Sequence, residues 1–280
     1  MIAARPDLLI LGGLAIDRLA DGSTVAGGSV VHGARAAAAS GRRVATITAA
    51  GPEPEAVAAV EELGRLGPCL HVPVSSSICY TIRDEGGQRR LIYEGGGALL
   101  AVMPADVARI DPRAVLLAPI AGELGVDATL ASVTVPVRVG ALQGWLRSLS
   151  PGEQVAALPL DALGDGLSAA LAELDALVAS NEDLAGVADD PRQQLAKLRD
   201  HFGAQPILAI TGGAAGAWLD GTPVGARWVP AARHIEGVST LGAGDAVAAL
   251  LAIALGDGLD PLAAIEAAII GTAEFLASRA

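Results

Sequence analysis

The chain has 280 residues, which is long enough to bury one large core, with or without a small appended unit. Its formal net charge of −12 excludes binding to nucleic acid or to an anionic membrane through the overall electrostatic field. No apolar stretch reaches the ~20 residues of a membrane span, and the first residues lack the basic region of a secretory leader. We therefore expect a cytoplasmic protein whose partner is a small molecule, with no nucleic acid and no membrane.

Short apolar runs alternate with alanine-rich segments of helical length. The runs predict buried strands at residues 8–11, 44–48, 115–118, 135–139, 176–179 and 207–211. The segments between them predict helices at residues 28–40, 53–66, 126–132, 167–174, 191–202 and 246–255. Because this alternation is typical of βαβ units, we predict a parallel sheet with helices on both faces. Ligands of such sheets bind beyond the carboxyl ends of the strands.

Two segments interrupt the alternation. Residues 16–25 look like a strand with a turn at Asp21 and Gly22. Residues 69–94 contain strand patterns on both sides of a polar turn at 84–87, which indicates a hairpin. We expect these segments, approximately 14–26 and 69–95, to form a small β-sheet lid within a single domain of residues 1–280. A plain extension of the main sheet is the alternative.

The most informative stretch is Thr240-Leu241-Gly242-Ala243-Gly244-Asp245. It leads into an apolar run of helical length, so its glycines should form the first turn of a buried helix. The free N–H groups of such a turn attract phosphate, and glycine lets the phosphate come close. An acid in the same turn adds a proton acceptor, which suits phosphoryl transfer to a hydroxyl. Tight packing by the glycines and a helix-dipole role for Asp245 are the alternatives.

A second group of candidates lies near the first predicted strand. Asp17 follows that strand within an apolar stretch and could bind sugar or polyol hydroxyls, or it could simply form a turn. Gly27 and Gly28 precede a predicted helix and could let a ligand approach the backbone. His32 lies one turn into that helix, where a satisfied structural histidine is the alternative to a functional one.

A polar cluster follows the predicted strand at 176–179. Asn181, Glu182 and Asp183 could lie near a phosphate and Mg²⁺, with the metal contact running through water. The alternative is that this cluster only caps a helix.

The predicted strand at 207–211 leads into a glycine-rich turn. Thr211 and the backbone of Gly213 and Gly216 could contact a nucleotide phosphate, or the glycines could serve the turn alone. This stretch is not a Walker A loop, and the chain start lacks the GxGxxG dinucleotide fingerprint. The absence of this fingerprint argues against a nucleotide-dependent oxidoreductase.

With these pieces in order, the chain resembles the ribokinase-like (PfkB) family of carbohydrate kinases over nearly its whole length. Residues 240–245 are similar to that family's C-terminal signature, DTxGAGD. Gly27-Gly28, followed by Ala34 and Gly41, is similar to its N-terminal signature, GGxxxNxAxxxAxLG. Three further motifs match, namely the acid that binds substrate hydroxyls at Asp17, NxxE at Asn181-Glu182, and TxGxxG at Thr211, Gly213 and Gly216.

The resemblance implies a three-layer α/β/α sandwich with a mostly parallel central sheet and a small β-sheet lid. It implies a kinase that uses ATP and Mg²⁺ to phosphorylate an alcohol group of a small sugar, polyol or nucleoside. The catalytic residues would be Asp245 as the base and Gly242, Ala243 and Gly244 as the anion hole. The substrate-binding residues would be Asp17, Gly27, Gly28 and His32. The ATP-binding residues would be Asn181, Thr211, Gly213, Gly216 and Thr240, with Glu182 and Asp183 acting indirectly on the metal.

Three positions depart from the family pattern. Ser239 stands at the leading Asp of DTxGAGD, and Leu184 at the Glu of NxxE, with Asp183 or Glu182 as possible substitutes. His32 stands at the signature Asn, which suggests an acceptor outside the ribose type. The run 142–147 also differs from the usual Asp-Pro-Asn after its strand and looks more like the branch that includes inositol kinases.

Two alternatives stay open at this point. The departures at Ser239 and Leu184 also allow a non-catalytic sugar- or nucleotide-binding protein on the same fold. An exposed edge of the lid would invite pairing with a second copy, so a homodimer through the lid is a further expectation.

Overall fold

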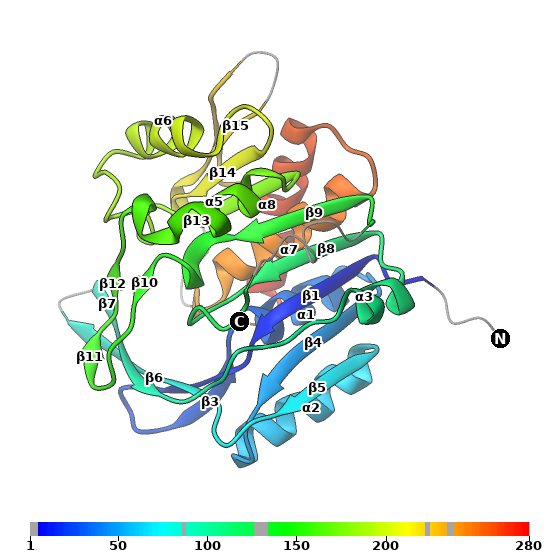
Figure 1. Ribbon diagram of the computed structural model, residues 1–280, viewed down its shortest axis with the longest axis vertical. Coiled ribbons are helices and arrows are strands. Elements are labelled where there is room, and N and C mark those ends of the chain that lie inside the picture. The colour runs from blue at the N-terminus through cyan, green and yellow to red at the C-terminus, as the bar shows by residue number, and fades with distance from the viewer. Residues whose placement is uncertain (1–4, 86–87, 126–133, 222–224, 234–237, 280) are drawn as a thin grey trace.

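The computed structural model describes residues 5–85, 88–125, 134–221, 225–233 and 238–279 (Figure 1). In these residues one sheet has the strand order β16-β15-β14-β13-β9-β8-β1-β4-β5. Its parallel strands are β14 (Ile207–Thr211), β13 (Ala176–Ser180), β9 (Val137–Ala141), β8 (Ala114–Ala118), β1 (Leu8–Gly13), β4 (Val44–Ala50) and β5 (Cys69–Pro73). β15 (Gly216–Asp220) and β16 (Arg227–Pro230) continue one edge in antiparallel register. The predicted mostly parallel sheet is confirmed.

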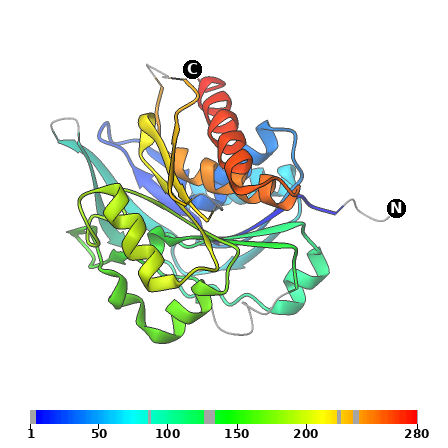
Figure 2. The ribbon, with the colours of Figure 1, turned by 90° about the horizontal axis from the view of Figure 1, so that it is seen from above.

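Helices cover both faces of this sheet, which gives three layers (Figure 2). β1 shows how the sequence directs this, since Leu8 and Ile10 pack toward one face and Leu9 and Leu11 toward the other. One face carries α1 (Ser29–Ala39), α2 (Pro54–Leu66), α7 (Ala243–Gly256) and α8 (Pro261–Ala277). The other carries α3 (Pro104–Ile110), α5 (Gly164–Ala172) and α6 (Pro191–Phe202).

The helix ends follow local signals in the sequence. α6 spans the predicted residues 191–202, because Pro191 starts it and the Asp190 carboxylate caps it by accepting from Arg192 N–H and Gln193 N–H. The helix predicted at 126–132 lies outside the described residues. Among the described residues, every helix is too short or too polar to span a bilayer.

A separate, smaller sheet projects beside the carboxyl ends of the central strands (Figure 1). Its order is β11-β7-β6-β2-β3, with bounds β11 (Glu153–Gln154), β7 (Gln88–Gly95), β6 (Ile78–Glu85), β2 (Ala15–Arg18) and β3 (Thr24–Gly27). β2 and β3 lie at the first segment expected for a lid, 14–26. The second begins later than expected, because Cys69–Pro73 forms β5, which pairs with β4 in the central sheet. The chain returns to that sheet after α2 as the second strand of a βαβ unit.

Several short elements complete the fold. They are a ladder of β10 (Arg147–Ser148) with β12 (Ala156–Ala157), and the 3₁₀ turns η1 (Leu142–Gly144), η2 (Leu160–Leu163) and η3 (Gly213–Ala215). η1 and β10 follow β9 directly, so their side chains emerge at the carboxyl edge of the central sheet.

Candidate active site

The amino-terminal turn of α7 is open on one side. Gly242, which precedes it, has a φ of +80°, and a Cβ atom there would lie 2.2 Å from Cγ of His32, so only glycine fits. The N–H of Ala243 donates to the Thr240 carbonyl at 3.1 Å. Among the described residues, the N–H groups of Gly242, Gly244 and Asp245 have no hydrogen-bond partner. The donors available to an anion therefore differ from the expected set by one residue, with Asp245 N–H in place of Ala243 N–H.

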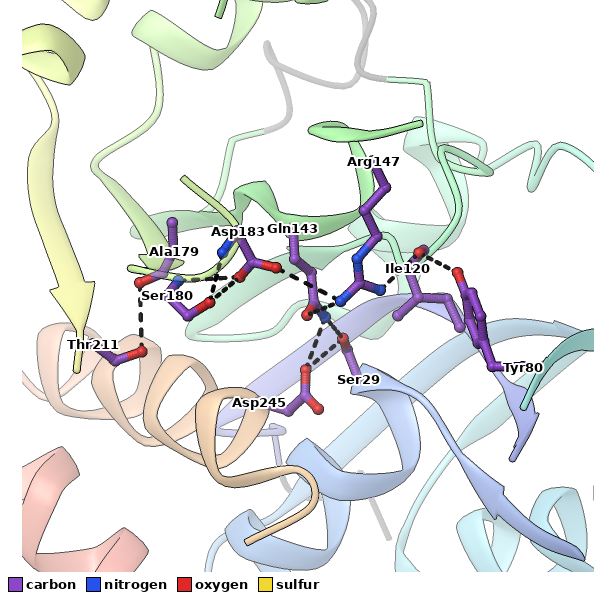
Figure 3. Close-up of polar contacts among 10 residues, drawn as sticks. All are labelled: Ser29, Tyr80, Ile120, Gln143, Arg147, Ala179, Ser180, Asp183, Thr211 and Asp245. Carbon is purple, nitrogen blue, oxygen red and sulfur yellow. Dashed lines mark hydrogen bonds and ion pairs between the residues drawn. The ribbon is translucent and has the colours of Figure 1, made fainter. Parts of the chain in front are cut away.

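The Asp245 carboxylate has one fixed oxygen and one open oxygen (Figure 3). Ser29 Oγ donates to Oδ1 at 2.6 Å, and Gln143 Nε2 donates to the same oxygen at 3.1 Å. Gln143 Nε2 also donates to Ser29 Oγ at 2.6 Å. Within the described part of the chain, Oδ2 has no hydrogen-bond partner, which leaves it free to accept a proton from a bound molecule.

Two side chains of the run 142–147, neither of them predicted as a site residue, lie near this carboxylate. Gln143 belongs to η1, and Arg147 begins β10. Arg147 Nη2 donates to Gln143 Oε1 at 3.2 Å, Nη1 donates to the Ile120 carbonyl at 3.0 Å, and Nη2 lies 3.6 Å from Asp183 Oδ1. The sequence held one signal for them, two polar side chains four residues apart in an otherwise apolar run after a strand.

The predicted acceptor residues lie together where the small sheet meets α1. Asp17 of β2 is buried, and a Cβ atom at Gly27 would lie 2.2 Å from its Oδ2 and 3.4 Å from Nε2 of His32. Glycine at position 27 therefore leaves the space that this carboxylate occupies beside the imidazole. Gly28 has a φ of +90°, and a Cβ atom there would lie 2.6 Å from the Gly13 carbonyl oxygen.

His32 is 5% exposed, and neither of its ring nitrogens has a hydrogen-bond partner in the described residues. Burial lowers its pKa below the ordinary value of 6.5; the negative charge of Asp245 opposes this shift, and the positive charges of Arg35 and Arg279 add to it. The imidazole is therefore neutral at neutral pH, with one nitrogen able to donate and the other to accept. Because unpaired buried polar groups cost free energy, this ring is suited to pairing with a ligand hydroxyl.

The lowered pKa of His32 leads to a prediction about stability. Between the folded and unfolded pKa values of His32, the unfolded chain binds more protons, so stability should fall as the pH drops below 6.5. The free energy of unfolding of the wild type, minus that of His32→Asn, should decrease on acidification through this range. Urea unfolding of both proteins across a pH series measures this difference. A difference that stays constant or increases on acidification would contradict the lowered pKa.

The end of the cavity beside β13 and β14 is lined by hydroxyl groups. Ser180 ends β13 and Thr211 ends β14, and Thr240 approaches from the segment before α7. Asn181, expected to contact ATP, does not line the cavity. Its N–H donates to the Thr211 carbonyl at 3.0 Å, and its own carbonyl accepts from Gln194 Nε2 at 3.0 Å. Asn181 thus joins the ends of two strands and a helix.

Gly213 and Gly216 also lie outside the cavity lining. Gly213 is exposed in η3, with a φ of +58°. Gly216 is buried in β15 beside β16, where a Cβ atom would lie 2.2 Å from the Val229 carbonyl oxygen. The two glycines allow the tight turn between β14 and β15, which is the turn role left open in the sequence analysis.

Glu182 and Asp183 both line the cavity, but their carboxylates differ. Asp183 Oδ2 accepts from Ser180 N–H at 3.1 Å and from Ser180 Oγ at 2.6 Å, while Oδ1 faces Arg147. Glu182 is exposed, and its carboxylate makes no hydrogen bond or ion pair within the described residues, although its backbone carbonyl accepts from Ala185 N–H at 3.2 Å. Leu184, at the position of the family's Glu, is fully buried in the core and cannot reach the cavity.

The donor set therefore fits Mg²⁺ only in a loosely held form. The part of the chain that the structure describes contains no cluster of three His, Cys, Asp or Glu side chains suited to a metal. Mg²⁺ commonly keeps several waters and binds one or two carboxylates together with substrate phosphates. Glu182 meets that need, because its carboxylate oxygens are unengaged at the edge of the cavity, whereas Asp183 is already held by Ser180 and Arg147.

These walls enclose a cavity of about 370 Å³ at the carboxyl ends of the central strands. Of the predicted site residues, those that line it are Asp17, Gly28, His32, Glu182, Asp183, Thr211, Thr240, Gly242, Ala243, Gly244 and Asp245. The small sheet closes one side with Tyr80, Arg90 and Gln154. Small-molecule sites commonly measure about 300–1,000 Å³, so the cavity suits a small polar ligand.

Three solved structures show the same fold. The chain is similar to a pyrophosphate-dependent kinase of the ribokinase family, solved with a pyrophosphate analogue and myo-inositol, at 18% identity and a TM-score of 0.77, over 96% of this chain and 95% of that one. It is similar to Arabidopsis thaliana ribokinase, solved with ribose and ATP, at 16% identity and a TM-score of 0.71, over 97% and 91% of the chains. It is also similar to Thermotoga maritima ribokinase, at 19% identity and a TM-score of 0.66, over 97% of this chain and 92% of that one.

No curated protein sequence matches the chain. A family model does match it, over residues 15–270, and this model is described as the pfkB family of carbohydrate kinases. The matched range includes Asp17, the glycines before α1 and the whole of α7. The chain therefore belongs to the pfkB family of carbohydrate kinases.

Proposed function

We propose that this protein transfers a phosphoryl group from ATP, with Mg²⁺, to an alcohol group of a small neutral sugar, polyol or nucleoside. The observation that supports this most strongly is the pairing at the start of α7. Unpartnered N–H groups and the open Oδ2 of Asp245 lie in the same turn, and both line one cavity. The N–H groups suit an anion, and the carboxylate suits removal of a hydroxyl proton.

The acceptor would bind between Asp17 and His32. A buried carboxylate can accept from a hydroxyl, and a neutral imidazole can both donate and accept. Paired contacts of this kind suit adjacent hydroxyls on a ring or a short chain. The acceptor hydroxyl would then point to Asp245, whose Oδ1 is held by Ser29 and Gln143.

The donor would lie across the hydroxyl groups of Ser180, Thr211 and Thr240, with Glu182 holding Mg²⁺ through water. When bound, Mg²⁺ would neutralise charge on the donor phosphates. One similar structure is a pyrophosphate-dependent kinase and another holds ATP, so both donors belong in any activity test.

The small sheet would act as a lid over this site. Tyr80 of β6 and Gln154 of β11 line the cavity, so closure of this sheet on the acceptor would exclude water. Exclusion of water would limit hydrolysis of the donor. The edge strands of this sheet, β3 and β11, would be the surface for a homodimer.

A non-catalytic binding protein would need the catalytic groups to be lost, and the site does not favour this. Ser239 is exposed, and its Oγ accepts from Leu241 N–H at 3.3 Å, so it still caps the turn before α7. The buried Leu184 removes one carboxylate, but Glu182 remains in the cavity lining.

The decisive experiment is a product screen with the purified protein and Mg²⁺. Pentoses, hexoses, inositols and nucleosides would each be incubated with ATP and, separately, with pyrophosphate. Release of ADP or orthophosphate, matched by the mass of a phosphorylated acceptor, would support the proposal. Acceptor and donor binding by calorimetry with no phosphorylated product in any reaction would support the binding protein instead.

A further inference from the structure

The Arg147 guanidinium is a partly buried positive charge in the cavity that the proposed roles do not use. Its side chain is only 17% exposed, and it reaches the cavity from β10 on the side facing the start of α7 (Figure 3). Arginine stays protonated in proteins, so a full positive charge is held here at all relevant pH values.

The carboxylates of Asp183 and Asp245 raise the pKa of Arg147, but in the described residues neither makes a close hydrogen bond to its guanidinium. The closer contacts of the guanidinium are to other groups. Two of them are neutral oxygens, on Gln143 and on the Ile120 carbonyl, and the guanidinium also lies 6.0 Å from the centre of the Tyr80 ring. Within the described residues, Arg147 forms one ion pair, with Asp183 at 3.6 Å. That distance exceeds the roughly 2.7–2.9 Å of a strong charge-assisted hydrogen bond.

Gln143 links this charge to the proposed base. Its Oε1 accepts from Arg147 and its Nε2 donates to Asp245 Oδ1, so two hydrogen bonds of 3.2 and 3.1 Å connect guanidinium and carboxylate. The link fixes the orientation of the Gln143 amide. It also holds Arg147 and Asp245 on either side of the same space, next to the open N–H groups of Gly242 and Gly244.

We propose that Arg147 is a catalytic residue that binds the phosphoryl group during transfer, from the wall opposite the N–H groups of α7. This inference rests on the proposed kinase function. In the reaction, the acceptor oxygen forms a bond to phosphorus and the bond to the donor's leaving oxygen breaks with its electron pair. The acceptor proton passes to Asp245 Oδ2. Arg147 forms no covalent bond and stabilises the charge on the equatorial oxygens.

The geometry suits this role better than a purely structural one. A planar guanidinium presents donors in pairs that match phosphate oxygens. Asp183 holds it loosely, and Asp183 is itself secured by Ser180, so a phosphate could displace the ion pair without disturbing the loop. The family's leading Asp and NxxE Glu are absent at Ser239 and Leu184, so a cation supplied by the protein would be of particular value here.

The test compares Arg147→Gln and Arg147→Lys with a matched control, Arg199→Gln. Arg199 is also a partly buried arginine, paired with Asp220 at 2.9 Å, and it does not line the cavity. We expect Arg147→Gln to lower kcat by about 10²- to 10³-fold, as loss of one oxyanion donor does, with little change in acceptor KM. Arg147→Lys should recover part of this loss, and added guanidinium ion should restore part of the activity of Arg147→Gln. Arg199→Gln should keep its kcat.

A second readout separates this inference from the proposed function. Calorimetry would measure pyrophosphate binding to the wild type and to Arg147→Gln, which requires no knowledge of the acceptor. Weaker binding by the variant, with an unchanged melting temperature, would support the role even if the product screen found no acceptor. Unchanged pyrophosphate affinity would overturn it, as would a loss of kcat that follows the loss of stability and is not restored by guanidinium.

Discussion

Replacement of Asp245 by asparagine should lower kcat by about 10²- to 10⁴-fold, the usual contribution of a general base. The amide oxygen can still accept from Ser29 Oγ and Gln143 Nε2, so the geometry of the wall should survive. The NH₂ group that replaces Oδ2 of Asp245 cannot take a proton from the acceptor hydroxyl. Steady-state kinetics and calorimetric titration with the donor measure the two effects separately, and donor affinity should stay near that of the wild type.

Ser29→Ala is the control for this prediction. It removes one donor to Oδ1 of Asp245 but leaves the carboxylate and its open oxygen in place. Its loss of kcat should be much smaller than that of Asp245→Asn. Full turnover in Asp245→Asn, or equal losses in the two variants, would show that the carboxylate does not act as the base.

The layers of the fold were predictable because each depends on a local pattern. The residues 8–11 alternate between the two faces of the sheet, and Pro191 with Asp190 starts α6 at the expected residue. The boundary of the small sheet was less predictable. Cys69–Pro73 has the same strand pattern as the hairpin that follows it. No local feature of the sequence indicates that it pairs with β4 in the central sheet and not with the small sheet. That choice follows from the crossover through α2, a long-range feature.

The candidate site also contains some residues that local sequence predicts and others that depend on long-range contacts. Gly242, Gly244 and Asp245 were identified because they adjoin in sequence and share one helix turn. Gln143 and Arg147 were not predicted as site residues, because their partners are Asp245, Ile120 and Asp183, which lie far away along the chain. Gly216 is the opposite case, a residue predicted as a site residue that lies outside the cavity lining. Its motif position predicts ATP contact, but the backbone of β16 fills the space beside it.

Leu184→Glu is the second substitution with a large expected effect, because the buried position of Leu184 does not suit the glutamate of the family motif. The motif would place a glutamate there, but the side chain of Leu184 is fully buried among the apolar residues that cover the α5 and α6 face. We expect Leu184→Glu to lower the free energy of unfolding by about 3–5 kcal/mol, as an uncompensated buried charge does. Restoring the motif residue should therefore reduce the amount of folded enzyme and not improve metal use.

The pH dependence of this loss has a defined sign. Burial should raise the pKa of the new carboxyl, as it does for the buried Glu123 despite the backbone N–H groups that Glu123 accepts from. The folded variant would then bind more protons than the unfolded chain above the ordinary glutamate pKa of 4.5, so the destabilisation should grow as the pH rises through that range. Leu184→Gln, which cannot ionise, should show a loss independent of pH, and Leu184→Met should lose less than about 1.5 kcal/mol. Urea unfolding across a pH series measures all three variants. Unfolding free energies for Leu184→Glu that match those of Leu184→Met would mean that residue 184 can reach solvent or the cavity, and that the metal-binding arrangement of the family can be restored in this chain.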